Sequence, residues 1–292
     1  MPHILQNDYL QIEIDLPHEG YRSSRFDWAG KIRQITYKGL PFTTTEVQQG
    51  FDSKQHGCGL YNEWDIDGPQ GFANCPIGSS FHKIGIGAIR KTDEVYDFSE
   101  PYSIDQAKFD YIVKENHITI NCYSVVLRGQ AYQLIKDIRI NENTIIISYQ
   151  LHNLGTQPLH TTEYVHNFIA INNDRIGKSY ELVLPSGVAP DSFDETVNPD
   201  DCVKIEDSTI SFNKAPTRPF FFGDLLGGVT APAHWHLYHR PSKMHITETG
   251  DFRAYRVNLW GTSHVISPEL FHRIEIPSNE VAIWSRTYKI WQ

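Results

Sequence analysis

Hydrophobic and polar residues alternate along much of the chain with a period of two. The clearest example is residues 10–16, where Leu and Ile share one face and Gln, Glu and Asp occupy the positions between them. This period is typical of a β-strand with one buried face. The same pattern predicts further strands at residues 31–37, 111–113, 117–124, 132–140, 144–151, 161–171, 234–239, 252–259, 271–276 and 281–290.

Turn-forming residues separate the predicted strands, and no helix signal competes with them. Asn, Gly, Asp and Pro cluster between the runs, as at residues 141–143, 153–155, 249–251 and 277–279. No stretch of a dozen residues repeats hydrophobic positions at the spacing of an amphipathic helix. Many strands joined by tight turns are typical of a sandwich or barrel. We therefore predict an all-β fold, a large antiparallel β-sandwich that occupies residues 1–292 as a single domain.

Three segments depart from the strand pattern. Residues 46–80 and 185–201 are rich in Gly, Pro, Asn and Asp. We predict that they are loops, and long loops on a rigid β-scaffold often carry function. Residues 83–91 contain spaced glycines that superficially look like a phosphate-binding loop. Such a loop leads into a helix, and no helix is predicted here, so we interpret this segment as a bent strand.

The composition narrows the possible functions. Hydrophobic residues make up 40% of the 292 residues and charged residues 21%, which allows a packed core. The formal charge of −9 argues against binding nucleic acid or an anionic membrane surface. The sequence has no signal-peptide pattern and no apolar run long enough to cross a bilayer, and its four cysteines form no CxxC pair. We expect a cytoplasmic protein whose cysteines are free thiols.

The most informative run is residues 161–172. On a strand, the side chains of Tyr164, His166 and Phe168 point to one face, and the residues between them point to the other. One face therefore carries a phenol, an imidazole and an aromatic ring in a row, which is typical of a concave sugar site. The simpler alternative is a partly buried histidine that pairs with a backbone carbonyl.

Three other groups of residues offer chemistry. Glu269 follows Pro268 and precedes an apolar pair, an environment that can raise the pKa of a carboxyl group toward a value useful for proton transfer. The segment 56–65 offers glycines for close backbone approach and polar groups for sugar hydroxyls. His234 and His236 have a spacing used by metal ligands, but no third ligand can be placed, and we predict no metal site.

Four segments of the chain resemble the aldose 1-epimerase (mutarotase) family, whose fold is galactose-mutarotase-like. Residues 30–39 are similar to the first hairpin of that family, and His-Gly-Cys-Gly at 56–59 is similar to its His-Gly-Gly loop. Residues 165–172 are similar to the element that carries its general acid, and residues 267–269 are similar to the segment that carries its catalytic glutamate. The order and rough separation of the four segments also match.

The resemblance implies a reaction and a set of residues. Glu269 would take the proton from the anomeric hydroxyl and His166 would protonate the ring oxygen, so that the sugar ring opens and closes again on the other face. Such an exchange needs no cofactor. The expected partner is a small-molecule sugar, with no nucleic acid and no membrane, and a homodimer is one option for the oligomeric state. The residues implied in sugar binding are Arg25, His56, Glu63, Tyr164 and His236.

Three alternatives remain open at this point. A non-catalytic sugar-binding or sensory protein would keep the pocket without the acid–base geometry. A sugar-6-phosphate 1-epimerase would need an anion pocket, because guanidinium groups match phosphate well. A lyase or hydrolase would use the histidines at 234 and 236 with a metal. The candidate residues for the anion pocket are Arg22, Arg25, Arg90 and Lys91.

Overall fold

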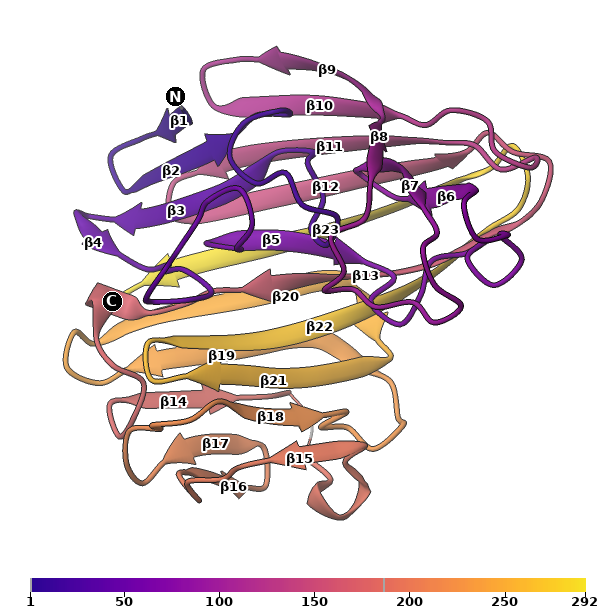
Figure 1. Ribbon diagram of the computed structural model, residues 1–292. Coiled ribbons are helices and arrows are strands. Elements are labelled where there is room, and N and C mark those ends of the chain that lie inside the picture. The colour runs from indigo at the N-terminus through magenta and orange to yellow at the C-terminus, as the bar shows by residue number, and fades with distance from the viewer. Residues whose placement is uncertain (1, 186) are drawn as a thin grey trace.

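Two long antiparallel sheets face each other, and a small third sheet lies beside them (Figure 1). The protein is described by a computed structural model that covers residues 2–185 and 187–292. The first sheet contains, in spatial order, β1 (His3–Gln6), β2 (Leu10–Asp15), β3 (Lys31–Tyr37), β5 (Leu60–Trp64), β13 (Leu159–Asn167), β22 (Val265–Ile276), β21 (Arg256–Thr262), β18 (Phe220–Gly223) and β15 (Glu195–Val197), with β4 (Leu40–Pro41) beside β3.

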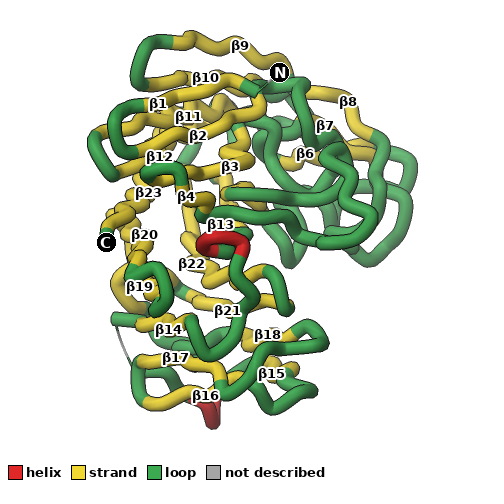
Figure 2. The backbone as a smooth tube through the Cα atoms, turned by 90° about the vertical axis from the view of Figure 1, so that its left-hand side faces the viewer, coloured by secondary structure: helices red, strands yellow, loops and turns green. Residues whose placement is uncertain are grey.

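The second sheet covers one face of the first. It contains, in spatial order, β16 (Val203–Glu206), β17 (Thr209–Phe212), β14 (Tyr180–Val183), β19 (Ala231–His239), β20 (Met244–Ala254), β23 (Val281–Trp291), β12 (Thr144–Asn153), β11 (Tyr132–Asn141), β10 (His117–Tyr123) and β9 (Lys108–Val113). The small sheet contains β6 (Ser80–Lys83), β7 (Gly87–Arg90) and β8 (Ile104–Gln106). Among the described residues, the helical segments are two short 3-10 turns, Ile171–Asn173 and Pro190–Ser192 (Figure 2).

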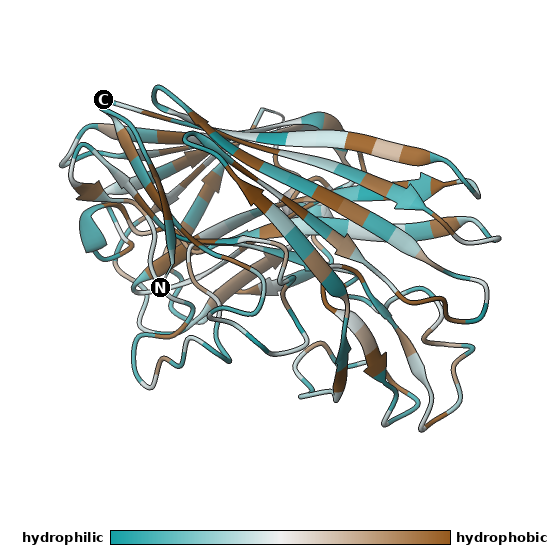
Figure 3. Cartoon of the chain, turned by 90° about the horizontal axis from the view of Figure 1, so that it is seen from above, coloured by the Kyte–Doolittle hydropathy of each residue, from teal (hydrophilic) through white to brown (hydrophobic). Residues whose placement is uncertain are grey.

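The predicted all-β antiparallel sandwich is confirmed, and the alternating sequence explains why it forms. Along β11 and β12 nearly every second residue is buried between the sheets, and the same alternation of hydrophobic and hydrophilic residues is visible along the long strands in Figure 3. A pleated strand sends successive side chains to opposite faces, so an alternating sequence supplies one face to the core and one to solvent.

Charged residues are also buried between the long sheets. Arg286 of β23 is fully buried, and its guanidinium group donates to both carboxylate oxygens of Glu163 on β13, at 3.0 and 2.7 Å. It also donates to Glu248 on β20. Because β13 belongs to the first sheet and the other two strands to the second, the ion pair of Arg286 with Glu163 joins the sheets across the core, whereas its pair with Glu248 lies within the second sheet.

A second apolar cluster lies on the opposite face of the first sheet. It joins Tyr61 and Val265 of that sheet, and Phe168 just after β13, to residues of the small sheet, such as Phe81 and Ile89. Loops and the small sheet therefore cover the outer face of the first sheet, and the loops gather on this side of the molecule in Figure 2.

Parts of the sequence-based prediction need correction. The loop predicted at residues 46–80 contains β5, whose five residues are all buried. A strand covered on both faces loses the alternating signal, which is why it was missed. The strand predicted at 252–259 is two strands that meet at Tyr255. The bent strand predicted at 83–91 is the hairpin of β6 and β7, turned at Gly85, where φ is +76° and a Cβ would lie 2.5 Å from the Cβ of Asp27.

Two further predictions concern the cysteines and the membrane. All four cysteines are buried and free, as predicted. Within residues 2–185 and 187–292, no helix has the length and apolar character that crossing a membrane would require.

Candidate active site

A cavity of about 330 Å³ lies on the loop-covered outer face of the first sheet. Four neighbouring strands supply its floor, because β13, β22, β21 and β18 lie side by side in the sheet. Loops from the first hundred residues and the edge strand β15 supply the rest of its wall. Its lining residues are Arg25, Glu46, Ile66, Phe98, Tyr164, His166, Glu195, Phe221, Asn258, Trp260 and Glu269.

His166 and Glu269 meet at this cavity. The Nε2 atom of His166 lies 3.4 Å from Oε1 of Glu269, and both residues are buried. His166 lies on β13 and Glu269 on β22, strands that are neighbours in the sheet although they are far apart in the sequence. The imidazole ring stacks on Phe168, with ring centres 4.1 Å apart, and meets the edge of Trp260 at 5.1 Å. These rings fix the plane of the imidazole.

The hydroxyl group of Ser267 touches both members of the pair. Its Oγ lies 2.9 Å from Nδ1 of His166 and 3.1 Å from Oε1 of Glu269, and it accepts a hydrogen bond from the backbone N–H of Asn167 at 3.0 Å. A hydroxyl has one hydrogen and can accept two hydrogen bonds. All three contacts are satisfied when Ser267 donates to Glu269 and accepts from Nδ1–H of His166. This pattern leaves Nε2 of the neutral imidazole without a hydrogen, facing Glu269.

Burial changes the ionisation of both groups. It raises the pKa of Glu269 to about 8, an effect that the nearby charge of Arg25 only partly opposes. Burial, together with the positive charge of Arg25, lowers the pKa of His166 well below its ordinary value. At neutral pH the pair is therefore a carboxylic acid beside a neutral imidazole. The sequence-based interpretation had a carboxylate and an imidazolium, which is the same pair with its one proton on the other partner.

Arg25 is held rigidly in the cavity wall. Its Nε atom donates to Glu63 at 2.8 Å and its Nη1 atom donates to Glu46 at 2.9 Å. The guanidinium carbon lies 4.6 Å from the ring centres of both Phe26 and Phe98.

The structure brings most of the predicted site residues together. Arg25, Tyr164, His166 and Glu269 line the cavity. Glu63 lies behind its wall, fully buried, where it accepts hydrogen bonds from Arg25 and from the hydroxyl of Tyr164. Glu63 therefore orients Arg25 and Tyr164, which line the cavity, and is not placed to touch a ligand itself.

The other two predicted binding residues lie elsewhere. His56 does not line the cavity; its Nδ1 atom accepts a hydrogen bond from the backbone of Asp52 at 3.0 Å. The backbone N–H of Gly57, the next residue, donates a hydrogen bond to Glu46 at 2.7 Å. The loop at 56–59 therefore supports the cavity by holding the lining residue Glu46. His236 lies on β19 of the second sheet, 2.8 Å from His245. Among the described residues, no three His, Cys, Asp or Glu side chains gather as a metal site would require.

Several lining residues were not identified from the sequence. Trp260 and Asn258 are two residues apart on β21 and both line the cavity. Asn258 lies directly opposite Glu269 of the neighbouring strand. Their strand pattern was detectable, but nothing in the sequence showed that β21 lies beside β22. Phe98 reaches the cavity from an irregular segment, and Glu195 reaches it from the short edge strand β15. The segment 185–201, predicted as a loop, contains β15 and the 3-10 turn Pro190–Ser192, and its residue 186 lies outside the described residues.

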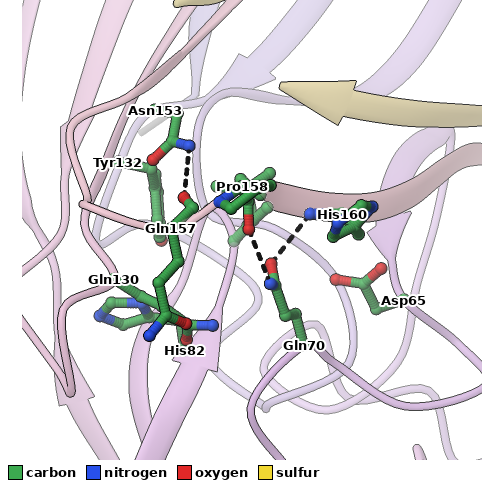
Figure 4. Close-up of a pocket in the computed structure, with 11 residues that line it drawn as sticks. Asp65, Gln70, His82, Gln130, Tyr132, Asn153, Gln157, Pro158 and His160 are labelled. Atoms are coloured by element: carbon green, nitrogen blue, oxygen red, sulfur yellow. Dashed lines mark hydrogen bonds between the residues drawn. The ribbon is translucent and has the colours of Figure 1, made fainter. Parts of the chain in front are cut away.

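A second cavity, shown in Figure 4, is lined by other residues, among them Asp65, His82, Tyr132 and His160. Its volume is about 20 Å³, which is room for about one water molecule. It is too small for a sugar, so the cavity at His166 is the better candidate site.

Comparison with solved structures places this architecture among known folds. The Slr1438 protein from Synechocystis sp. PCC 6803 matches with a TM-score of 0.60 at 10% identity, covering 99% of this chain and 95% of that chain. A galactose mutarotase related enzyme from Lactobacillus acidophilus matches with 0.58 at 9% identity, covering 100% and 98%. A galactose mutarotase-like protein from Lactobacillus casei ATCC 334 matches with 0.58 at 10% identity, covering 100% of both chains.

The sequence itself matches no protein-family model and no curated protein. The structural likeness extends over nearly the whole of each chain at about one identical residue in ten. The chain therefore has the galactose-mutarotase-like fold that was predicted from its sequence.

Proposed function

We propose that this protein interconverts the α and β anomers of an aldose by acid–base opening and closing of the sugar ring. The observation that carries the proposal is the buried pair of His166 and Glu269 at the floor of one cavity, 3.4 Å apart and held by a shared serine. The resemblance of the sequence to aldose 1-epimerases supports the same reaction.

The ionisation of the pair suggests how the protons move. Ring opening removes a proton from the anomeric hydroxyl O1 and adds one to the ring oxygen O5. Neutral His166 accepts the O1 proton at Nε2, and the carboxylic acid of Glu269 gives its proton to O5. The resulting carboxylate and imidazolium reverse both transfers after the aldehyde has rotated. This assigns the roles the opposite way from the sequence-based prediction, and the pair returns to its starting state without any net gain of protons.

Exchange spectroscopy tests the proposal directly. Saturation-transfer NMR measures the interconversion of α and β anomers of free aldoses with and without the protein. We expect acceleration of at least one aldose, since each positioned proton transfer contributes about 10²–10⁴-fold. If no aldose is accelerated while sugars still bind, the proposal fails and a sugar-binding protein of this fold takes its place.

The rate should depend on pH through the single proton that the pair shares. The pair gains a second proton as pH falls through the pKa of His166, which lies well below its ordinary value, and loses its last proton as pH rises through the pKa of Glu269, about 8. We expect kcat/KM for anomer exchange to form a plateau between these limits, with a fall on the alkaline side near pH 8. A profile that is already falling between pH 6 and 7 as the pH is raised would contradict this ionisation state.

Ser267 should act as a positioning residue. Replacing it by Ala removes the hydrogen bonds that orient His166 and Glu269, and we expect kcat to fall about 10–100-fold, the range typical of groups that orient a functional side chain. KM should change little, because Ser267 does not line the cavity. The serine hydrogen bond lowers the pKa of Glu269, so the alkaline limb should move to higher pH in Ser267→Ala.

The matched variant Ser267→Cys keeps the volume and a weak donor, and it should retain an intermediate rate. A purely structural role would lower the stability of both variants and leave the pH profile in place. Rates are measured by NMR exchange and stability by thermal unfolding.

A further inference from the structure

The charged side chains that line the cavity determine which charge on a sugar it favours. Among the described residues, Arg25 is the cation that lines the cavity, whereas Glu46, Glu195 and Glu269 line it with carboxyl groups. The other members of the predicted anion pocket are elsewhere: Arg90 is exposed on β7, and the amino group of Lys91 lies 3.1 Å from a carboxylate oxygen of Glu94. Arg22 donates to the backbone of His18.

The charge of Arg25 is already balanced. Two carboxylates contact its guanidinium group, Glu46 at 2.9 Å and Glu63 at 2.8 Å. Glu195 lies on the edge strand β15, and no ion pair joins it to any described residue. Among the lining residues, two carboxylates, Glu46 and Glu195, therefore stand against one guanidinium group, even when Glu269 is counted as neutral.

We propose that the cavity selects an aldose that carries an ammonium group, such as a hexosamine, and disfavours a phosphorylated or carboxylated sugar. The inference rests on the proposed function. A surplus of negative charge in a cleft attracts a cationic ligand and repels an anion. A phosphate would also need a free cation in the wall, and Arg25 is already paired twice.

The aromatic walls fit the same ligand. Trp260, Phe221 and Phe98 line the cavity. Their faces offer apolar surface to the C–H groups of a sugar, and an aromatic face also attracts an ammonium group. The cavity thus combines acidic and aromatic groups, a combination that suits a cation attached to a sugar ring.

The test compares sugars that share the glucose ring and differ in the charge and kind of one substituent. Anomer exchange is measured at mildly acidic pH, where the amino group is protonated, for glucosamine, N-acetylglucosamine, glucose and glucose 6-phosphate. We expect kcat/KM for glucosamine to exceed that for glucose about tenfold, the effect of roughly one favourable charge pair at intermediate dielectric. N-acetylglucosamine, which is uncharged, should lose this advantage, and glucose 6-phosphate should be the poorest substrate.

Glu195→Gln removes the unpaired carboxylate. In this variant the ratio of kcat/KM between glucosamine and glucose should fall to about a third or less of its wild-type value. The matched control is Glu280→Gln, an exposed glutamate in a turn outside the cavity lining, which should leave the ratio unchanged. Added salt should also reduce the ratio in the wild-type protein, because screening weakens attraction between partly exposed charges.

The outcomes separate this inference from the proposed function. Equal rates for glucosamine and glucose, or a preference for glucose 6-phosphate, overturn the inference and leave ring opening in place. Failure to accelerate any aldose, these four and the other free aldoses included, overturns the proposed function. In that case binding followed by the change in tryptophan fluorescence, to which Trp260 in the cavity wall contributes, still tests the charge preference: tighter binding of glucosamine than of glucose supports it, and equal or weaker binding overturns it.

Discussion

Glu269→Gln and His166→Ala are each expected to slow anomer exchange by about 10²–10⁴-fold. Gln cannot release the proton that the ring oxygen needs, and Ala cannot accept the proton of the anomeric hydroxyl. Gln has nearly the volume of Glu, and the buried Glu269 is protonated at neutral pH, so the fold should tolerate the neutral amide. The loss should therefore appear in kcat more than in KM.

Two residues on the same strands provide matched controls. His160 lies on β13 and Glu275 on β22, and they form an exposed pair 3.9 Å apart. His160→Ala and Glu275→Gln change the same side-chain types without touching the cavity lining. Both controls should exchange anomers at the wild-type rate in saturation-transfer NMR.

The result that would contradict this assignment is specific. If the wild-type protein is active and both Glu269→Gln and His166→Ala keep its rate, other groups move the protons, and the proposed roles of the pair are wrong. Circular dichroism and thermal unfolding of each variant show whether a lost rate reflects a lost fold, a concern chiefly for His166→Ala because its ring packs between Phe168 and Trp260.

The sequence predicted the fold best where one face of a strand is buried. The long strands β11, β12 and β23 alternate clearly and were placed to within a few residues. Strand β5 is buried on both faces and carries Asn62 and Glu63 in its interior, so its composition looked like that of a loop. Its polar residues are paired within the protein, with Asn62 contacting Glu163 and Lys136, and a single sequence does not reveal such partners.

Which side chains could carry chemistry was predictable from the sequence, but which strands bring them together was not. The alternation in β13 placed Tyr164 and His166 on one face, which the structure confirms, since both line the cavity. Strand pairing between β13, β22 and β21 is long-range, and only the family resemblance suggested that Glu269 belongs beside His166. Ser267 and Trp260 are recognisable as functional candidates only after that pairing is known.

Removal of Arg286 is expected to cause the largest loss of stability. Its guanidinium group bridges Glu163 and Glu248 in the space between the sheets, and all three side chains are fully buried. Arg286→Met leaves two buried carboxyl groups without their cation, and breaking a buried ion pair in this way costs about 3–5 kcal/mol. The free energy of unfolding is measured by urea denaturation, with an unchanged m-value showing that the transition stays comparable.

Two comparisons isolate the cause. Arg240→Met removes an exposed arginine that pairs with Glu181 and should cost about 1 kcal/mol or less. In the triple variant Arg286→Met, Glu163→Gln, Glu248→Gln no buried charge is left unpaired, so much of the lost stability should return. If the triple variant is as unstable as Arg286→Met alone, packing of the arginine rather than its charge accounts for the loss.

The pH dependence of Arg286→Met gives an independent check. Burial already raises the pKa of Glu163, and the charge of Arg286 opposes that rise. Without the arginine, the pKa of Glu163 in the folded protein rises further above its value in the unfolded chain. A carboxyl group with a raised pKa favours the folded state below its unfolded pKa and loses that contribution as the pH rises through its folded value. The stability deficit of Arg286→Met should therefore be large at neutral pH and shrink as the pH falls, whereas a deficit caused by lost packing would stay constant.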